Sequence, residues 1–278
     1  MYLFFFYAVP MSPTVQDILD IIDAIAPAHL AEPWDNVGLM IGNPAAPVTG
    51  ILLGLDPTTP LLDEARTLGA NLVVTHHPLF FHPLKSVNLG QPEGRFIDLA
   101  LQNRMSVLSS HTNFDSAPDG TSDIVARRLG LRNIQPLVPH ACGQPGCGLG
   151  RIGDFAEPLA AEEFLGRLRA ACSPPWLLGA GTAPERISRV AVCGGSCGEL
   201  ADQALRAGAQ VLVTAEVKHH LARLAEDTGL WLIDAGHFAT EFPGMHHLAR
   251  LLATEVGKRF SETPVAVTGT QVAPLKLI

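Results

Sequence analysis

The feature that most constrains the fold is an order of strand-like and helix-like segments that occurs twice along the chain. In residues 51–111, three short apolar runs (ILLGLD, NLVVTHH and SVLSSH) are separated by two segments with helical periodicity. Residues 189–237 repeat this order with the runs RVAVCGG, QVLVTAE and LWLIDAGH. Such alternation is typical of parallel sheets with crossover helices. We therefore predict an α/β fold with two similar strand-helix-strand-helix-strand halves, which we interpret as an internal duplication.

The two halves give a predicted division of the chain. Thr14 and Asp17 are typical of a capped helix N-terminus, and the amphipathic segment after them ends near Pro27. The segment between the halves holds one clear helix, AAEEFLGRLRAAC, and a stretch rich in glycine and proline. We expect two lobes that pack as one functional unit, with four ranges: an N-terminal extension outside the fold (1–13), a first half (14–130), a connector (131–188) and a second half (189–278).

Composition limits the class of protein. Apolar residues make up 47% of the 278 positions and charged residues 17%, which provides enough apolar material for a packed core. The net charge is −8, and the sequence has no run of lysine and arginine. Because phosphate backbones are bound by clustered cations, we expect no nucleic-acid partner.

Cysteine usage and the apolar segments indicate the compartment. Five cysteines at irregular spacing do not suit a disulfide framework, so we expect reduced thiols and a cytoplasmic location. The opening MYLFFFYAVP has no basic residues and is too short to cross a bilayer, and a start at Met11 would remove it. No other segment reaches transmembrane length, so we expect no membrane partner.

Histidines and carboxylates follow three of the predicted strands. They come as one tandem pair and as two pairs spaced four residues apart: His76 and His77, His111 and Asp115, His237 and Glu241. Because the carboxyl ends of parallel strands meet at one edge of a sheet, we expect these six side chains in a single cleft. Each motif alone has a structural explanation, as a turn before Pro78 or as a helical pair, but the joint pattern favours a metal site.

The types of ligand indicate which metals fit and how many. Imidazole and carboxylate suit Zn, Fe, Mn, Co or Ni, whereas a calcium site would be nearly all oxygen. Five or six candidate ligands are more than one ion needs. We therefore predict two divalent ions about 3.5–4 Å apart that share a bridging carboxylate and activate a water. Asp115 or Glu241 would be the bridge. His111 is predicted as the catalytic residue that positions a proton or the water, and the sequence leaves open whether it also contacts the metal. The predicted metal ligands are His76, His77, Asp115, His237 and Glu241.

Other polar residues have weaker signals. The loop 194–198 has two interpretations, an anion site on free backbone N–H groups or a tight turn that needs glycine. Cys193 and Cys197 flank this loop without the base that a catalytic thiol requires. The other histidines are expected at the surface or behind the ligands, and His219 and His220 are the first to test because they also lie near a strand end.

Four motifs in combination resemble a known family. EPWDNVGLMIG, THHPLFF, HTNFD and GHFATE are similar to the YbgI-like proteins, also described as Ngg1-interacting-factor-three-like proteins and labelled GTP cyclohydrolase 1 type 2 homologues. The resemblance runs from about Thr14 to Phe260. It implies a two-lobed α/β fold, a dinuclear metal site between the lobes with the same five ligands, and a homohexameric ring. Where many relatives have Thr-Gly-Asp/Glu, this chain has Thr214-Ala215-Glu216.

Two functions follow from the residues and the resemblance. The first is a dinuclear-metal-dependent hydrolase that acts on a small nucleotide-like or phosphorylated substrate; fold and metal site alone do not fix which one. The second is a metal-binding interaction or scaffold protein with structural ions and no turnover. A DNA-binding module is disfavoured because the sequence has no basic stripe.

Overall fold

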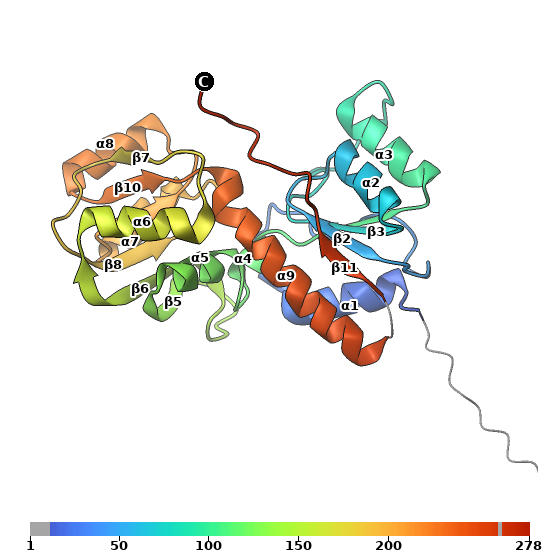
Figure 1. Ribbon diagram of the computed structural model, residues 1–278, viewed down its shortest axis with the longest axis horizontal. Coiled ribbons are helices and arrows are strands. Elements are labelled where there is room, and N and C mark those ends of the chain that lie inside the picture. The colour runs from blue at the N-terminus through green and yellow to red at the C-terminus, as the bar shows by residue number, and fades with distance from the viewer. Residues whose placement is uncertain (1–11, 261–262) are drawn as a thin grey trace, which may run out of the picture.

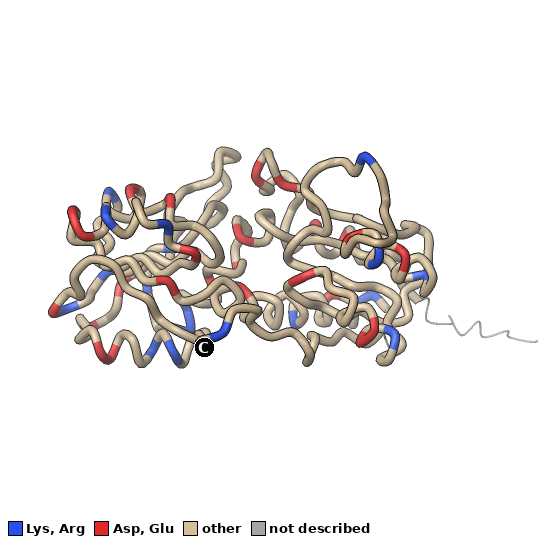
Figure 2. The backbone as a smooth tube through the Cα atoms, turned by 90° about the horizontal axis from the view of Figure 1, so that it is seen from above, with Lys and Arg blue, Asp and Glu red and all other residues tan. Residues whose placement is uncertain are grey.

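Two sheets, each covered by helices on both faces, form the two lobes of this computed structural model, which describes residues 12–260 and 263–278 (Figure 1). Seen from above, the two lobes lie side by side (Figure 2). The expectations for MYLFFFYAVP and for a start at Met11 lie outside the described residues, as does most of the predicted extension 1–13. None of the helices in the described ranges is long and apolar enough to span a bilayer.

The first sheet has the strand order β1-β4-β3-β2-β11, in which β1 is antiparallel to its neighbour and the other strands are parallel. The elements of this lobe are α1 (Val15–Ile25), η1 (Ala28–Leu30), β1 (Gly38–Ile41), β2 (Ile51–Gly54), α2 (Thr59–Thr67), β3 (Leu72–Thr75), α3 (Pro92–Gln102), β4 (Ser106–Ser109), α4 (Thr112–Ser116) and β11 (Val265–Val267). The predicted start of the first helix is confirmed, because Thr14 and Asp17 form a capping box.

The second sheet has the order β5-β6-β8-β9-β10-β7, with β8, β9 and β10 parallel and the outer strands antiparallel. The elements of this lobe are α5 (Thr121–Leu129), β5 (Arg132–Pro139), β6 (Gly148–Leu159), α6 (Ala161–Cys172), β7 (Leu178–Ala180), β8 (Ile187–Val192), η2 (Gly198–Leu200), α7 (Ala201–Arg206), β9 (Val211–Thr214), α8 (His219–Thr228), β10 (Trp231–Asp234) and α9 (His237–Arg259).

The six predicted strands form the parallel centre of the two sheets, which confirms the α/β fold class. Their side chains alternate between two covering layers. In the first lobe, Leu53 and Val74 pack toward α1 and α9, whereas Leu52 and Val73 pack toward α2 and α3. The strands are therefore buried on both faces, which explains why they are almost continuously apolar in the sequence.

The segment 131–188, predicted as a connector, contributes three strands and one helix to the second sheet. β5 and β6 extend one edge, β7 pairs with β10 at the other edge, and α6 packs on one face. Conversely, β11 comes from the second half of the sequence and pairs with β2 in the first lobe. Each sheet therefore contains strands from more than one of the predicted ranges. The ranges 14–130 and 189–278 describe the repeated order of segments in the sequence, and their use as a domain division remains a proposal.

Helix α9 joins the lobes and fixes their spacing. It begins directly after β10 and runs across the molecule to pack against α1, β2 and β11 (Figure 1). α5 lies close against it, because a Cβ atom on Gly244 would come within 2.8 Å of Thr121 Cγ2. The start of α5 is further held by Arg151, a fully buried side chain whose guanidinium donates to Asp123 at 2.6 Å. These contacts place the start of α5 beside the strand ends of both lobes.

Candidate metal centre

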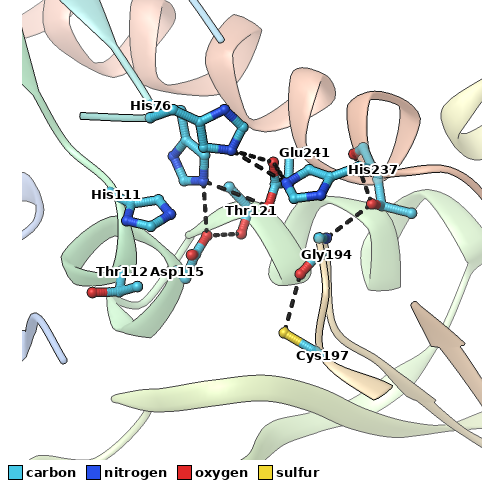
Figure 3. Close-up of polar contacts among 12 residues, drawn as sticks. His76, His111, Thr112, Asp115, Thr121, Gly194, Cys197, His237 and Glu241 are labelled. Atoms are coloured by element: carbon cyan, nitrogen blue, oxygen red, sulfur yellow. Dashed lines mark hydrogen bonds and ion pairs between the residues drawn. The ribbon is translucent and has the colours of Figure 1, made fainter. Parts of the chain in front are cut away.

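The predicted ligands come together between the two lobes. His76 and His77 follow β3, Asp115 lies in α4 directly after β4, and His237 and Glu241 occupy the first turns of α9 after β10. Figure 3 shows His76, Asp115, His237 and Glu241 pointing toward a common centre. The carboxyl ends of three strands therefore deliver these side chains to one place.

His77, His237 and Glu241 are in direct contact. His77 Nε2 lies 3.1 Å from Glu241 Oε2 and 3.2 Å from His237 Nε2. His237 Nε2 lies 2.9 Å from the same carboxylate oxygen. His77 from the first lobe thus meets the beginning of α9. One ligand atom each of His77, His237 and Glu241 lies within 4.8 Å of the ligand atoms of the other two.

His76 is fully buried and has one ring nitrogen without a hydrogen bond. Its Nδ1 donates to the Ser110 carbonyl at 2.9 Å. Its Nε2 makes no hydrogen bond to any residue that the structure describes, and two carboxylate oxygens, of Asp115 and Glu241, lie 3.5 and 3.8 Å away. A buried imidazole nitrogen that faces two carboxylates without a bond to either is the arrangement expected of a metal ligand, so this donor set fits a divalent ion.

Asp115 and His111 lie on the first-lobe side of the centre. Asp115 accepts a hydrogen bond from Thr121 Oγ1 at the start of α5. The His111 ring centroid lies 5.0 Å from that of His76, and one ring nitrogen of His111 falls within 4.8 Å of ligand atoms of His76 and His77. His111 is therefore close enough either to contact a metal or to act beside it.

The Nδ1 atoms of all four histidines have hydrogen-bond acceptors. Asp56 accepts from His77 at 2.7 Å, Glu216 from His237 at 2.8 Å and Asp35 from His111 at 2.9 Å, while a backbone carbonyl serves His76. Acceptors in this position fix the tautomer and orientation of a metal-binding imidazole and leave Nε2 free for the ion.

The three carboxylates that hold Nδ1 atoms are absent from the residues predicted from sequence. Asp56 and Glu216 follow β2 and β9 at the same sheet edges as the ligands, so their position along the chain indicates that they lie near the candidate centre. Asp35 lies in EPWDNVGLMIG and is also bound by the backbone N–H of Thr112 at 3.0 Å. Only the folded chain shows which histidine each of them holds.

The charges of the centre depend on burial and on these hydrogen bonds. Burial lowers the pKa of His77, but hydrogen bonds to Asp56 and Glu241 outweigh it and raise the pKa to about 10. Burial also lowers the pKa of His237, but hydrogen bonds to Glu241 and Glu216 outweigh it and raise the pKa to about 9. Burial lowers the pKa of His76. For Glu241, burial opposes ionisation, but hydrogen bonds from His237 and His77 hold its pKa well below the usual range.

The loop 194–198 forms a turn that leaves room for Glu241. The N–H of Gly194 donates to Ser122 Oγ at 3.2 Å and that of Gly195 to Thr240 Oγ1 at 3.0 Å, so these groups are already bonded within the protein. A Cβ atom on Gly195, whose φ is +68°, would lie 2.1 Å from Glu241 Oε1. This geometry favours the tight-turn interpretation over the anion site.

The remaining histidines and the two cysteines lie outside the ligand groups. His82, His219, His220 and His246 are exposed, and His247 is buried beside Arg250. A hydrogen bond with Cys193, together with burial, raises the pKa of the Cys197 thiol, so this thiol is not activated as a nucleophile. Among the described residues, two groups of side chains could hold a metal ion: His76, His77 and His111, and His77, His237 and Glu241.

The chain is similar to known proteins over almost its whole length. A family model described as Duf34/NIF3 (NGG1p interacting factor 3) matches residues 13–272. A Streptomyces coelicolor protein named GTP cyclohydrolase 1 type 2 homolog is 36% identical over 235 residues, which cover 83% of this chain and 82% of that protein. A Nostoc protein with the same name is 40% identical over 204 residues, or 73% of this chain and 76% of its own. The crystal structure of the Staphylococcus aureus hypothetical protein SA1388 matches with a TM-score of 0.88 and 27% identity, and covers 96% of this chain and 100% of that one.

Proposed function

The chain belongs to the Duf34/NIF3 family, and from this premise we propose that it is a dinuclear-metal-dependent hydrolase of a small molecule. The observation that carries the proposal is the convergence of imidazole Nε2 atoms on Glu241 and Asp115, with each Nδ1 held by an acceptor and the buried Nε2 of His76 left without a hydrogen bond. Groups arranged in this way would hold cations with little rearrangement.

The proposed ligands are His76, His77, Asp115, His237 and Glu241. Two divalent ions in this position, drawn from Zn, Fe, Mn, Co or Ni, would activate a water and polarise the substrate. Glu241 is buried between His76 and His77 and directs one oxygen toward each, which suits a carboxylate that bridges two ions. Asp115 is fixed by Thr121 and would complete the set on the first-lobe side.

His111 is the proposed catalytic residue. Its ring is oriented through Nδ1 by Asp35, and burial, which raises the pKa of that carboxyl, is outweighed by hydrogen bonds from His111 and Thr112 that lower it to about 2. Asp35 is therefore ionised at neutral pH and keeps the proton on His111 Nδ1. The free Nε2 would then accept or return a proton at the reacting group.

The substrate classes that we propose are nucleotide-like or phosphorylated small molecules. Support comes from the name of the relatives, GTP cyclohydrolase 1 type 2 homolog, and from the chemistry open to two metal ions, which includes ring opening and phosphoester cleavage.

The test begins with elemental analysis of protein purified without added metal and continues with a screen of nucleotide and phosphoester hydrolysis. His76→Ala and Glu241→Ala should lose both metal and turnover while they remain folded by circular dichroism. His220→Ala, which changes an exposed histidine, is the control and should keep both. Turnover that survives in a chelated, metal-free sample would overturn the proposal.

A second candidate is a metal-binding interaction protein without turnover. A specific observation favours it: large apolar side chains are exposed on the loop after β3 and beside it, namely Trp34, Phe81, Leu84, Val87 and Leu89. Exposed apolar clusters often mark surfaces that bind other proteins. If this candidate holds, metal removal should change the oligomeric mass and the hydrolysis screen should show no turnover.

A further inference from the structure

The backbone that carries Asp56 continues β2 between β3 on one side and β11 on the other. On the side of β3, the N–H of His77 donates to the Leu55 carbonyl at 2.9 Å. On the opposite side, β11 ends at Val267, which pairs with Leu53. Leu55 and Asp56 therefore extend past the end of the neighbouring strand, where their backbone groups need other partners.

The side chain of Gln271 supplies these partners. Its Oε1 accepts hydrogen bonds from the backbone N–H groups of Leu55 at 2.7 Å and Asp56 at 3.3 Å. Its Nε2 donates to the backbone carbonyl of Asp56 at 2.6 Å. Gly54 leaves room for this approach, because a Cβ atom there would lie 2.9 Å from Gln271 Oε1. One side-chain amide, which has both a donor and an acceptor, thus replaces the missing strand.

The segment before Gln271 is tied to α2. Glu64 on this helix accepts hydrogen bonds from three consecutive residues, Thr268, Gly269 and Thr270. The backbone N–H of Thr268 also donates to the Leu53 carbonyl at 2.8 Å. The glutamine side chain is therefore directed at the end of β2 by an anchored segment.

The carboxylate of Asp56 depends on this backbone for its position. It accepts from His77 Nδ1 at 2.7 Å, and no other described residue forms a hydrogen bond with it. The Asp56 side chain is 38% exposed, so water competes with the imidazole for its oxygens. The hydrogen bond to His77 is therefore kept by the place of the backbone and not by packing around the carboxylate.

We propose that Gln271 is a positioning residue of the metal centre, which holds the backbone of Asp56 so that its carboxylate orients His77 toward the ion. This assignment rests on the proposed function, because it concerns the metal affinity of the same site. It makes the C-terminal segment a part of the centre, in addition to the strand ends of the two lobes.

The chain contains a matched control for this glutamine. Gln210 makes the same bonds at the start of β8: its Oε1 accepts from two consecutive backbone N–H groups and its Nε2 donates to a carbonyl, in Ser188, Arg189 and Arg186. The start of β8 is the end of the strand opposite to the loop 194–198 that contacts Glu241. Methionine in place of either glutamine removes the same bonds and keeps a side chain of similar length.

The experiment measures Zn²⁺ affinity of the full-length protein by competition with a chromophoric chelator. Gln271→Met should weaken Zn²⁺ binding about tenfold, the lower end of the range for loss of a group that orients a ligand. Gln210→Met should keep wild-type affinity. Urea unfolding of the metal-free variants should show similar losses of stability, so that a difference in affinity does not come from folding.

A double-mutant cycle tests whether Gln271 acts through Asp56. Asp56→Ala should weaken Zn²⁺ binding at least as much as Gln271→Met does. Gln271→Met added to Asp56→Ala should then change the affinity by less than about twofold, because the carboxylate that it positions is gone. A further tenfold loss in the double variant would overturn the assignment, as would wild-type affinity in Gln271→Met or an equal loss in Gln210→Met.

A measurement on the metal-free protein separates this assignment from the proposed function. With ¹⁵N-labelled histidine, the His77 Nδ1–H bonded to Asp56 should give a low-field proton resonance, assigned by its loss in Asp56→Ala. This resonance should be lost in Gln271→Met and kept in Gln210→Met. A wild-type protein that binds no Zn²⁺ would contradict the proposed function alone, whereas a resonance that is absent from the wild type or unchanged in Gln271→Met would overturn the role of Gln271.

Discussion

At the residue scale, the carboxylates behind the histidines should set the affinity for metal. Glu216 is half-exposed and contacts the candidate centre through His237 Nδ1. Glu216→Gln keeps the size of the side chain but removes its charge, so the imidazole becomes a weaker ligand. Loss of such a partner typically costs about 10- to 100-fold in metal affinity. Competition with a chromophoric chelator measures the change.

The control for this prediction is Glu199→Gln, which removes a carboxylate of similar exposure that pairs with Lys218. Its metal affinity should equal that of the wild-type protein. If Glu216→Gln also retains wild-type affinity, Glu216 has no orienting role.

Protons and metal ions should compete for the same histidines. In the metal-free protein, the pKa values of about 10 for His77 and about 9 for His237 mean that both rings are protonated at pH 7. Metal must displace these protons, so its affinity should rise with pH up to about 9–10, and binding at pH 7 should release about two protons per chain. Calorimetry in two buffers with different ionisation enthalpies counts them. A binding enthalpy that is independent of the buffer would contradict this.

The same shift predicts how the stability of the metal-free protein changes with pH. A pKa raised from 6.5 to about 10 means that the folded state binds the proton on His77 more tightly than the unfolded state does. This stabilisation is fully present below pH 6.5 and is lost as the pH rises through about 10. Urea unfolding at pH 7 and pH 10 should therefore show lower stability at the higher pH.

At the element scale, the turn after β8 should be essential for the position of Glu241. In Gly195→Ala the added Cβ would lie 2.1 Å from Glu241 Oε1, so the carboxylate has to move and metal binding should be lost. Gly69→Ala is a matched control, because Gly69 has a φ of +72° with nothing within 4 Å of an added Cβ. Both variants should lose about 1 kcal/mol of stability from backbone strain, but only Gly195→Ala should lose metal. Equal metal content in the two variants would contradict this role.

The elements that could be predicted from sequence are the ones buried on both faces. The parallel strands are apolar because helices cover both sides, and residues such as Leu53 and Val74 reveal this without coordinates. The edge strands carry no such signal: β7 is three residues long and has two exposed positions, and β5 alternates with exposed side chains. They pair with strands that are distant in sequence, which local periodicity cannot indicate.

The same distinction holds for the candidate centre. The ligands lie at the ends of predictable strands, so their convergence could be predicted from order alone, whereas their metal-binding role stays a prediction. Asp56 and Glu216 needed the fold, because each is identified by the histidine it contacts, 21 residues away in both cases. Gln271 lies outside the elements predicted from sequence, and its place beside Asp56 depends on how β11 pairs with β2.

At the scale of the whole molecule, the exposed apolar loop after β3 should be covered in an assembly. The family resemblance implies a homohexamer, and side chains such as Phe81 and Val87 are apolar and exposed in the single chain. We expect a mass in solution of six times the 29.6 kDa of one chain. Light scattering after gel filtration measures it, and Val87→Lys should lower the mass. A monomer at micromolar concentration would contradict the predicted ring.

Both lobes together should hold a pair of metal ions, and anomalous diffraction from a crystal of the metal-loaded protein would locate them. We expect two anomalous peaks about 3.5–4 Å apart, enclosed by His76, His77, His237, Asp115 and Glu241. A map from a crystal with full metal occupancy that shows no peak at this centre, or a single ion elsewhere on the molecule, would contradict this expectation.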